Sequence, residues 1–530
     1  PPTATVPPPE HRIGVRVVDG VGEFYDRVTG ERFVPRGANY IRLDWQRNRA
    51  GDRFLGHSTF GPGFYDAERA EQALAQMQAD GYNVARVFLE TGTTTSIDGT
   101  YGLSDAYMDN VADFLRLAQA HDIYVIFATD WVPDAPPYSE IIARECCEIF
   151  NSSNAVHLSA SGVEANRLFF ADVARALLDR QAPLEAVFSF NVSNELSFDS
   201  DQPPLSWTSG TVTPGNGQTY DMANPADKRR MIDDGVVYFI DQVRAAIREV
   251  SPTALVGVGF FEPQEPNPSR VGDPRVIRTY PAIWESTADY VDLHTYPGFD
   301  LTLAEYVENY EINGMVEKPI VMGEFGAFRA PFPTAQDAAL ALVDWQVESC
   351  QYGFDGWLVW TWDREDHELY SALSDEGAIN SMLAPAVRPD PCAFGEGVQR
   401  NLALGAEVRA SAELSHEPAA HAVDGKASTQ WGAGADPPQW IEVDLGAPAA
   451  VSELRLLVAQ WPEGETVHRV SVRGATGDFV EVVRFSQVTR QDDWLVFTPD
   501  SPLTNVQVVQ VETVSSPSWT AWKEIQVMGE

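Results

Sequence analysis

The sequence predicts two folded units, an α/β unit built as a (β/α)8 TIM barrel and an all-β sandwich that follows it. Three observations predict this: short apolar strands alternate with amphipathic helices over about 365 residues, eight such strands can be counted, and the helical pattern stops near residue 399. A chain of 530 residues is long enough for two or three hydrophobic cores. We predict a proline-rich linker over residues 1–12, the barrel over 13–390, a second linker over 391–398 and the sandwich over 399–530.

The eight predicted strands are rich in Val, Ile, Phe or Tyr, as expected for a parallel sheet that is buried on both faces. They are FVPRGAN from Phe33, NVARVFLE from Asn83, YVIFATD from Tyr124, AVFSFNVSNE from Ala186, ALVGVGF from Ala254, YVDLHTY from Tyr290, PIVMGEFG from Pro319 and GWLVWTW from Gly356. Helical spacing of apolar residues fills the segments 66–81, 106–122, 162–179, 228–250 and 334–353. The helices after the fifth and sixth strands are predicted to be shorter. This order fits a barrel with insertions.

The amino-acid composition of the chain changes at residues 385–397, where PAVRPDPCAFGEG is rich in proline and glycine. Short alternating strands follow, namely WIEVDLG, SELRLLVA, HRVSVRG, VEVVRF, DWLVFT and NVQVVQVE. Their spacing predicts an antiparallel β-sandwich of about 130 residues.

The net charge of −40 argues against nucleic acid and anionic membrane surfaces as partners, because like charges repel. A neutral polysaccharide remains compatible, although acidity can also serve only to keep a protein soluble. No stretch approaches the roughly 18 apolar residues that cross a bilayer, so we expect no membrane insertion. The opening PPTATVPPPE does not read as a signal peptide. We expect a secreted monomer whose signal peptide has been removed, with a cytosolic protein as the alternative.

The four cysteines, Cys146, Cys147, Cys350 and Cys392, lack the CxxC spacing of a zinc site. One or two disulfides would form in an oxidising compartment, for instance one that ties Cys392 back onto the barrel. Free buried thiols are the alternative, and the sequence does not fix the pairing.

Polar residues at the ends of the predicted strands are the candidates for a site, because barrel active sites lie at the carboxyl ends of the strands. These residues are Asn39, Arg86, Glu90, Asp130, Trp131, Asn194, Glu195, Glu262, His294, Tyr296, Glu324, Trp360 and Trp362. They include neither a Ser/His/Asp set nor a histidine cluster suited to a metal. Carboxylates and aromatics dominate instead.

Two carboxyl groups that flank a glycosidic bond can hydrolyse it, and a retaining mechanism places them about 5–5.5 Å apart. Glu195 on strand four and Glu324 on strand seven can face each other across the ring of strands. Arg86 and Tyr296 can hydrogen-bond a carboxylate and keep it ionised. Asn194 can donate to a sugar hydroxyl, and Trp360 offers a flat face for a sugar ring. Taken singly, such a Glu is usually an ion-pair partner, and His294 or Trp360 would more often belong to the core.

The combination of SNE, HTY and GEFG at three strand ends resembles the clan A retaining glycosidases, most closely glycoside hydrolase family 5, which includes cellulases and β-mannanases. The likeness covers roughly residues 30–365 and includes RGANY, NVARVF, DLHTYPG and WLVWTWD. It implies Glu195 as acid/base and Glu324 as nucleophile, with Arg86, Asn194, His294, Tyr296 and Trp360 around the substrate. Asn39, Asp130 and Trp131 are further candidates for binding substrate. Family members often carry a His near the end of strand three, where this chain has Asp130 and Trp131, which leaves the sugar undefined.

The second unit resembles a discoidin (factor 5/8 C-type) domain, which in bacteria is carbohydrate-binding module family 32. The markers are NLALGAEVRAS, AHAVDGKASTQW, PPQWIEVDLG and WTAWKEIQVMG. The turn AVDGKAST can fold oxygens around a hard cation. By resemblance, a structural Ca²⁺ would take the carbonyls of His421, Lys426 and Lys523, an oxygen of Thr429, and the carboxylates of Asp424 and Glu524. Closure of the turn by hydrogen bonds alone is the alternative.

Aromatic residues and long loops suggest where sugars bind. Trp461 and Trp519 fall in loops and could stack on a sugar, whereas Trp431 and Trp440 are predicted to pack in the core. The loops 134–161 and 198–224 are predicted to wall the barrel cleft, with exo and endo action both open.

The sequence thus predicts a retaining β-glycosidase that acts on an oligosaccharide or polysaccharide and needs no cofactor for catalysis. A transglycosylase and a non-catalytic carbohydrate-binding barrel are the alternatives.

Overall fold

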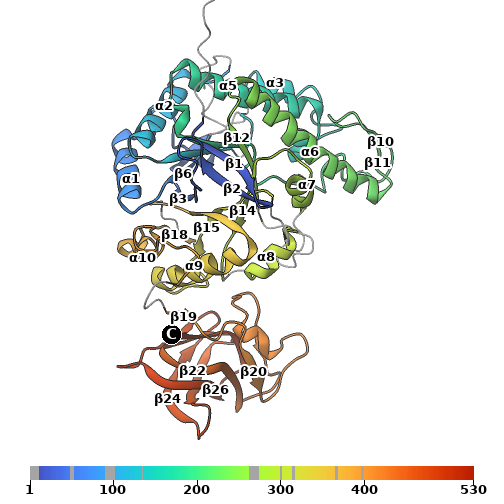
Figure 1. Cartoon of the computed structure of the whole chain (residues 1–530). Helices are drawn as coiled ribbons and strands as arrows, with labels where there is room; N and C mark the ends of the chain where they lie inside the picture. The colour runs from blue at the N-terminus through green and yellow to red at the C-terminus, as the bar shows by residue number, and fades with distance from the viewer. Residues whose placement is uncertain are drawn as a thin grey trace, which may run out of the picture.

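The computed structural model describes residues 11–47, 53–89, 102–129, 131–133, 135–261, 274–298, 301–312, 317–364, 368–394 and 399–529. The chain forms a barrel with helices around it and, beside it, a separate β-sandwich (Figure 1). The predicted fold class is therefore confirmed.

The barrel closes through eight parallel strands that follow one another around the ring in chain order. They are β3 (Arg36–Asn39), β6 (Val84–Phe88), β7 (Tyr124–Ala128), β8 (Val187–Asn191), β12 (Leu255–Phe260), β14 (Tyr290–Thr295), β15 (Ile320–Phe325) and β17 (Phe354–Val359). Seven of them lie within the predicted strands, and β17 begins two residues before the predicted strand 356–362. All their residues are buried except Tyr124 and Asp355, as expected for strands covered by helices on one side and by the barrel core on the other.

Six of the described helices around the barrel begin at a polar side chain that caps them. Side chains of Asp66, Ser104, Ser159, Asn224, Thr302 and Thr334 accept hydrogen bonds from the first turns. The helices are α1 (Ala67–Ala79), α2 (Asp105–Ala120), α5 (Ala160–Asp179), α6 (Pro225–Val250), α7 (Thr279–Trp284), α8 (Leu303–Asn309), α9 (Ala335–Ser349) and α10 (Ser374–Leu383). The helices after the fifth and sixth strands, α7 and α8, are short, as predicted.

The two long predicted loops contain short elements of their own. Residues 134–161 include α3 (Tyr138–Ile142) and α4 (Ser152–His157). Residues 198–224 include β9 (Phe198–Asp199) and the two-stranded pair β10 (Thr211–Val212) and β11 (Tyr220–Asp221). β9 also pairs with β13 (Arg275–Val276), which fixes this loop against the connection after β12.

An N-terminal hairpin, β1 (Ile13–Val18) and β2 (Val21–Asp26), covers the amino end of the barrel. Ile13 and Phe24 are fully buried and pack against residues near the starts of the barrel strands, such as Phe188 and Tyr290. Of the predicted linker 1–12, residues 1–10 lie outside the described part of the chain. The backbone N–H of His11 already donates to Thr253, so the chain is attached to the barrel there.

The sandwich pairs its longer strands in the order β27, β22, β26, β23, β24. Its strands are β19 (Arg400–Asn401), β20 (Glu407–Ala410), β21 (Trp431–Gly432), β22 (Gln439–Val458), β23 (Gly464–Arg473), β24 (Val480–Thr489), β25 (Trp494–Phe497), β26 (Leu503–Ser515) and β27 (Ala521–Gly529). The predicted strands 440–446 and 452–459 are one strand, β22, which pairs with β26 first and with β27 further on. Trp431 is fully buried, as predicted, but Trp440 is only partly buried.

All four cysteines form disulfides, so the free-thiol alternative was wrong. Cys350, at the end of α9, is bonded to Cys392, which ties the segment before the sandwich to the barrel. Cys146 is bonded to its neighbour Cys147. Among the described helices, none combines the length and the apolar composition that a bilayer crossing needs.

Candidate active site

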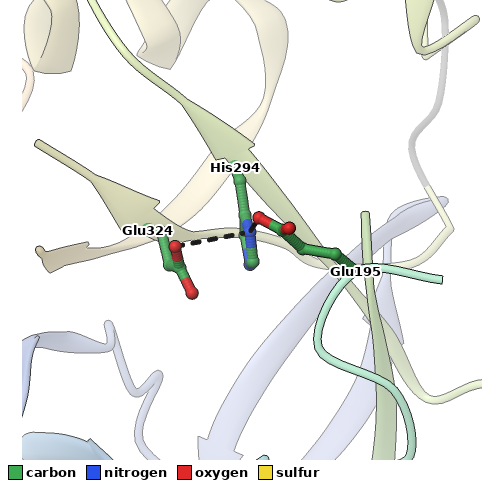
Figure 2. Close-up of side chains that lie close together, drawn as sticks. All are labelled: Glu195, His294 and Glu324. Carbon is green, nitrogen blue, oxygen red and sulfur yellow. Dashed lines mark hydrogen bonds and ion pairs between the residues drawn. The ribbon is translucent and has the colours of Figure 1, made fainter. Parts of the chain in front are cut away.

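The barrel brings the two predicted glutamates together around a histidine. Figure 2 shows His294, from β14, between Glu195, which follows β8, and Glu324, from β15. Nδ1 of His294 lies 2.9 Å from Oε1 of Glu195 and 3.5 Å from Oε2 of Glu324. One oxygen of each carboxylate and a ring nitrogen of His294 lie within 4.8 Å of one another. This close approach fits the roughly 5–5.5 Å carboxyl spacing of a retaining mechanism.

Glu324 is buried and accepts two hydrogen bonds. Nη1 of Arg86 donates to Oε1 at 2.8 Å, and the hydroxyl of Tyr296 donates to Oε2 at 2.9 Å. Both donors favour the ionised carboxylate. The side chain of Glu195 is 31% exposed, against 4% for Glu324. The more open carboxyl can therefore meet a departing group or water, while the deep one is held in a fixed direction.

Arg86 is fully buried and connects residues from several strands. Its Nη1 also donates to Oδ1 of Asn39 at 2.9 Å, and its Nη2 donates to Oδ1 of Asn194 at 2.5 Å. Nδ2 of Asn39 donates in turn to the carbonyl of Gly323, beside Glu324. This network fixes the position of Arg86 and the direction of its bond to Glu324.

Asp292, on β14, belongs to the same network, and the sequence analysis did not include it. Its Oδ2 lies 3.2 Å from Nε of Arg86, and its Oδ1 lies 3.6 Å from Nε2 of His294. Nδ2 of Asn191 donates to Oδ2 at 2.5 Å. A signal existed in the sequence, because residues two apart on a strand share a face and Asp292 precedes His294 by two.

His57 is a second residue that the sequence analysis missed. It ends β5 (Arg53–His57), which pairs with β4 (Leu43–Arg47), and its ring stacks on Phe88 with centroids 4.0 Å apart. Burial, with the charge of Arg86, lowers the pKa of His57 to about 3. His57 is therefore neutral in the folded protein at ordinary pH.

The charges around the carboxyl pair are strongly coupled. Burial lowers the pKa of His294, but the charges of Glu324 and Asp292 outweigh burial and raise it to about 10. Burial raises the pKa of Glu195, yet the hydrogen bond and charge of His294 bring it below its ordinary value. Burial, together with the charge of Glu195, outweighs His294 and Arg86 and leaves the pKa of Glu324 above its ordinary value.

A charge count gives the protonation state of this group. Asp292, Glu195 and Glu324 are three carboxyls, and Arg86 and His294 are two cations. Because uncompensated buried charge is costly, the excess negative charge favours uptake of a proton by the group as a whole. One proton shared by two close carboxyls is what general acid chemistry requires.

Glu195, His294 and Glu324 also satisfy the distances of a metal site. A metal would need a neutral His294, whereas the pKa of His294 is raised to about 10. Arg86 already supplies a positive charge at Glu324. The donor set thus suits proton transfer better than metal binding.

The remaining candidate site residues differ in how far they are buried. Trp360 is partly exposed and meets Phe88 edge to face, with ring centroids 5.9 Å apart. Trp131 is 47% exposed, and no described contact links it to the carboxyl pair. Trp362 is buried. Asp130, Glu90 and Glu262 lie outside the described residues.

Known families match both parts of the chain. The model described as cellulase, glycosyl hydrolase family 5, matches residues 46–366, which is more than half of the chain. The chain belongs to glycosyl hydrolase family 5. It is therefore a glycoside hydrolase of the retaining clan A. The F5/8 type C domain model matches residues 407–525.

Solved structures resemble each part of this family 5 hydrolase. The exo-beta-1,4-mannosidase Op5Man5 from Opitutaceae bacterium strain TAV5 is 16% identical, with a TM-score of 0.47, covering 71% of this chain and 63% of that one. The endo-1,4-beta-mannanase from Eisenia fetida is 18% identical, with a TM-score of 0.44 and coverages of 72% and 98%. The family 32 module of C. perfringens NanJ, in complex with galactose, is 18% identical, with a TM-score of 0.23 and coverages of 25% and 99%. No curated protein sequence matches the chain.

The turn predicted to bind calcium brings most of its candidate ligands together. The hydroxyl of Thr429 donates to Asp424 at 2.9 Å and lies 3.2 Å from the carbonyl of Lys426. The N–H of Gly425 donates to Oε2 of Glu524 at 3.3 Å. Glu524 is 2% exposed, and its buried Oε1 has no hydrogen-bond partner. Burial and the nearby Asp424 raise the pKa of Glu524 far above its ordinary value. A buried carboxylate with an unused oxygen beside a second carboxylate fits a hard cation.

Proposed function

We propose that this family 5 hydrolase is a β-glycosidase that cleaves O-glycosidic bonds of an oligosaccharide or polysaccharide, with Glu324 as nucleophile and Glu195 as acid/base. The observation that carries the assignment is the asymmetry of the pair. Glu324 is deep and receives two donors aimed at its oxygens, whereas Glu195 is partly open.

In the first step, an oxygen of Glu324 attacks the anomeric carbon while Glu195 donates its proton to the departing oxygen. The glycosidic bond breaks, a glycosyl ester forms on Glu324 and the leaving sugar gains a hydroxyl. In the second step, Glu195 removes a proton from water, which attacks the same carbon and releases Glu324 as a carboxylate. The configuration is inverted twice and hence retained. Only protein carboxyls and water take part, so no cofactor is needed.

The surrounding residues position the substrate and the charges. Arg86 and Tyr296 hold the carboxylate of Glu324 in its direction of attack. Because Oδ1 of Asn194 is bound to Arg86, its Nδ2 is the atom that can donate to a sugar hydroxyl. Trp360 supplies the face for the sugar ring, and Asp130 and Trp131 are further residues that we propose to bind substrate.

We propose that the second domain binds sugar and holds a structural Ca²⁺. Asp424, Glu524, Thr429 and the carbonyls of His421, Lys426 and Lys523 would hold the ion. Trp461 and Trp519 are 85% and 53% exposed, and Gly464 and Pro517 in their loops lie close together, which supports a shared sugar platform. Disulfides persist in oxidising compartments, so the two in this chain support secretion.

Azide rescue tests the two roles. Wild type, Glu324→Ala, Glu195→Ala and the surface control Glu68→Ala are assayed on aryl β-glycosides and β-linked polysaccharides. Both active-site variants should lose hydrolysis of any substrate that the wild type and control cleave. Azide should then give an α-glycosyl azide with Glu324→Ala, because it attacks in place of the nucleophile. With Glu195→Ala it should give a β-glycosyl azide, because it attacks the glycosyl ester.

If Glu324→Ala gave the β-glycosyl azide and Glu195→Ala gave the α-glycosyl azide, the two roles would be reversed. No cleavage of any β-glycoside by the wild type would contradict the substrate class. Product analysis at high acceptor concentration separates hydrolysis from transglycosylation, which shares the same glycosyl ester.

A further inference from the structure

The second domain contacts the barrel at the first turns of two helices, α8 and α9. Figure 1 places both helices on the side of the barrel that faces the sandwich. Nζ of Lys426 lies 2.6 Å from Oε1 of Glu305 on α8. Arg455 on β22 forms an ion pair with Asp337 on α9, and both side chains are less than a tenth exposed. The contact is therefore partly buried and charged, with cations from the sandwich and carboxylates from the barrel.

The carboxylates of Glu305 and Asp337 also cap the helices that carry them. Glu305 and Asp337 are the third residues of their helices and complete capping boxes with Thr302 and Thr334. In each carboxylate, one oxygen accepts the N–H of the capping threonine. The other oxygen pairs with a basic side chain of the sandwich, Lys426 for Glu305 and Arg455 for Asp337. The sandwich therefore holds the starts of the two helices together with their caps.

These helices follow the strands that carry the site. α8 follows β14, which carries His294, and α9 follows β15, which carries Glu324. The N–H of Ala427 also donates to the carbonyl of Gly298 at 3.2 Å. Gly298 comes two residues after Tyr296, which donates to Glu324. A fixed sandwich thus restrains Gly298, which follows closely on Tyr296.

The docking residues lie in the turn predicted to bind the cation. Lys426 and Ala427 sit between Asp424 and Thr429, and the hydroxyl of Thr429 bonds the carboxylate of Asp424. A cavity between the domains is lined from the barrel by Gly298, Thr302 and Asp337 and from the sandwich by Asp424, Gly425 and Arg455. The shape of this turn therefore decides whether Lys426 and Ala427 reach the barrel.

We infer that the 424–429 turn is the docking element that holds the sandwich on the catalytic barrel, and that cation binding in this turn stabilises the docked arrangement. The partner surface is the barrel of the same chain, at the first turns of α8 and α9. Docking restrains Gly298 and Thr302 and thereby the hydroxyl of Tyr296 at Glu324. The cation dependence rests on the proposed Ca²⁺ site, whereas the docking contacts stand without it.

A charge swap tests the docking contact in the full chain. Lys426→Glu should increase the radius of gyration in small-angle scattering and speed amide hydrogen exchange at Gly298 and Thr302. Adding Glu305→Lys should restore the radius of gyration, because the pair is re-formed with its signs exchanged, whereas the N–H of Thr302 loses its cap in this variant. Arg409→Glu, an exposed charge reversal in the sandwich, is the matched control and should change neither. Unchanged exchange and dimensions in Lys426→Glu would overturn the proposal.

Calcium titration tests the coupling. Calorimetry first measures Ca²⁺ binding to the full chain, independently of activity. Chelation of the wild type should reproduce the scattering and exchange changes of Lys426→Glu, and Ca²⁺ should reverse them. If Ca²⁺ binds but chelation leaves the two domains docked, the coupling is wrong. If Ca²⁺ does not bind, the proposed cation site and the coupling both fail, and the charge swap still decides the docking contact. Neither readout depends on the proposed catalytic roles.

Discussion

Asp292 and Glu324 contact different nitrogens of Arg86: Oδ2 of Asp292 is 3.2 Å from Nε, while Oε1 of Glu324 is 2.8 Å from Nη1. Arg86 thus neutralises two carboxylates at once, and His294 is the second cation of the group. The negative charge of Asp292 helps to raise the pKa of His294, whose charge in turn lowers the pKa of Glu195. Asp292 therefore contacts both cations of the site and acts on the carboxyl pair through them.

Asp292→Asn should lower the pKa of the catalytic acid. Removing a nearby negative charge makes ionisation of the carboxyl pair easier, by about one pKa unit or more for a buried neighbour. The alkaline limb of the kcat/KM profile should move to lower pH, and activity at neutral pH should fall. A pH–rate series on wild type and Asp292→Asn measures this, with the surface variant Glu68→Gln as control. If the alkaline limb of the kcat/KM profile lay at the same pH in wild type and Asp292→Asn, Asp292 would act only through packing.

Gly323→Ala should destabilise the protein, because the carboxylate of Asp292 occupies the place of the added Cβ. We expect a loss of about 1–3 kcal/mol in the free energy of unfolding, the range for overpacking a filled core. Urea denaturation of Gly323→Ala, Asp292→Ala and the double variant measures the coupling. Since Asp292→Ala makes room for the methyl group, the double variant should lose less than the sum of the two single changes. Strict additivity would contradict the steric cause.

The Cys350–Cys392 disulfide should stabilise the barrel against unfolding. It closes a segment with a sequence separation of 42, for which loop entropy gives about 4 kcal/mol. The variant Cys350→Ser/Cys392→Ser should therefore unfold at lower denaturant concentration than wild type. Reductant should lower the midpoint of the wild type but not that of the variant, apart from any effect of the Cys146–Cys147 pair. An unchanged midpoint in the variant would show that other contacts already order this segment.

The sequence was sufficient for the barrel strands and the glutamate pair, because burial on both faces and position at a strand end are local properties. Asp292 was missed because it lies inside a strand, where a polar residue reads as an interruption of the apolar pattern. His57 was missed because only the fold brings its hairpin onto Phe88. The Cys350–Cys392 pairing and the contacts of Lys426 and Arg455 join residues that are well separated in the chain, and no periodicity encodes those distances.

Asp344, on α9, should make the stability of the protein depend on pH. Burial raises its pKa to about 7, and the nearby charge of Glu348 adds to the rise. The charges of Arg400 and Arg388 and the hydrogen bond from the N–H of Asn401 lower the pKa but do not outweigh burial. In the unfolded chain the pKa of Asp is about 3.9, so the folded state binds this proton more tightly. The contribution of Asp344 to stability is therefore most favourable below about pH 4. It falls as the pH rises towards 7 and is constant above that, at a cost of at most about 4 kcal/mol. Asp344→Asn should remove this slope and be more stable than wild type at pH 8, while the two proteins converge near pH 4. Denaturant midpoints of both proteins between pH 4 and 8 measure the difference, and parallel curves would show that Asp344 titrates normally.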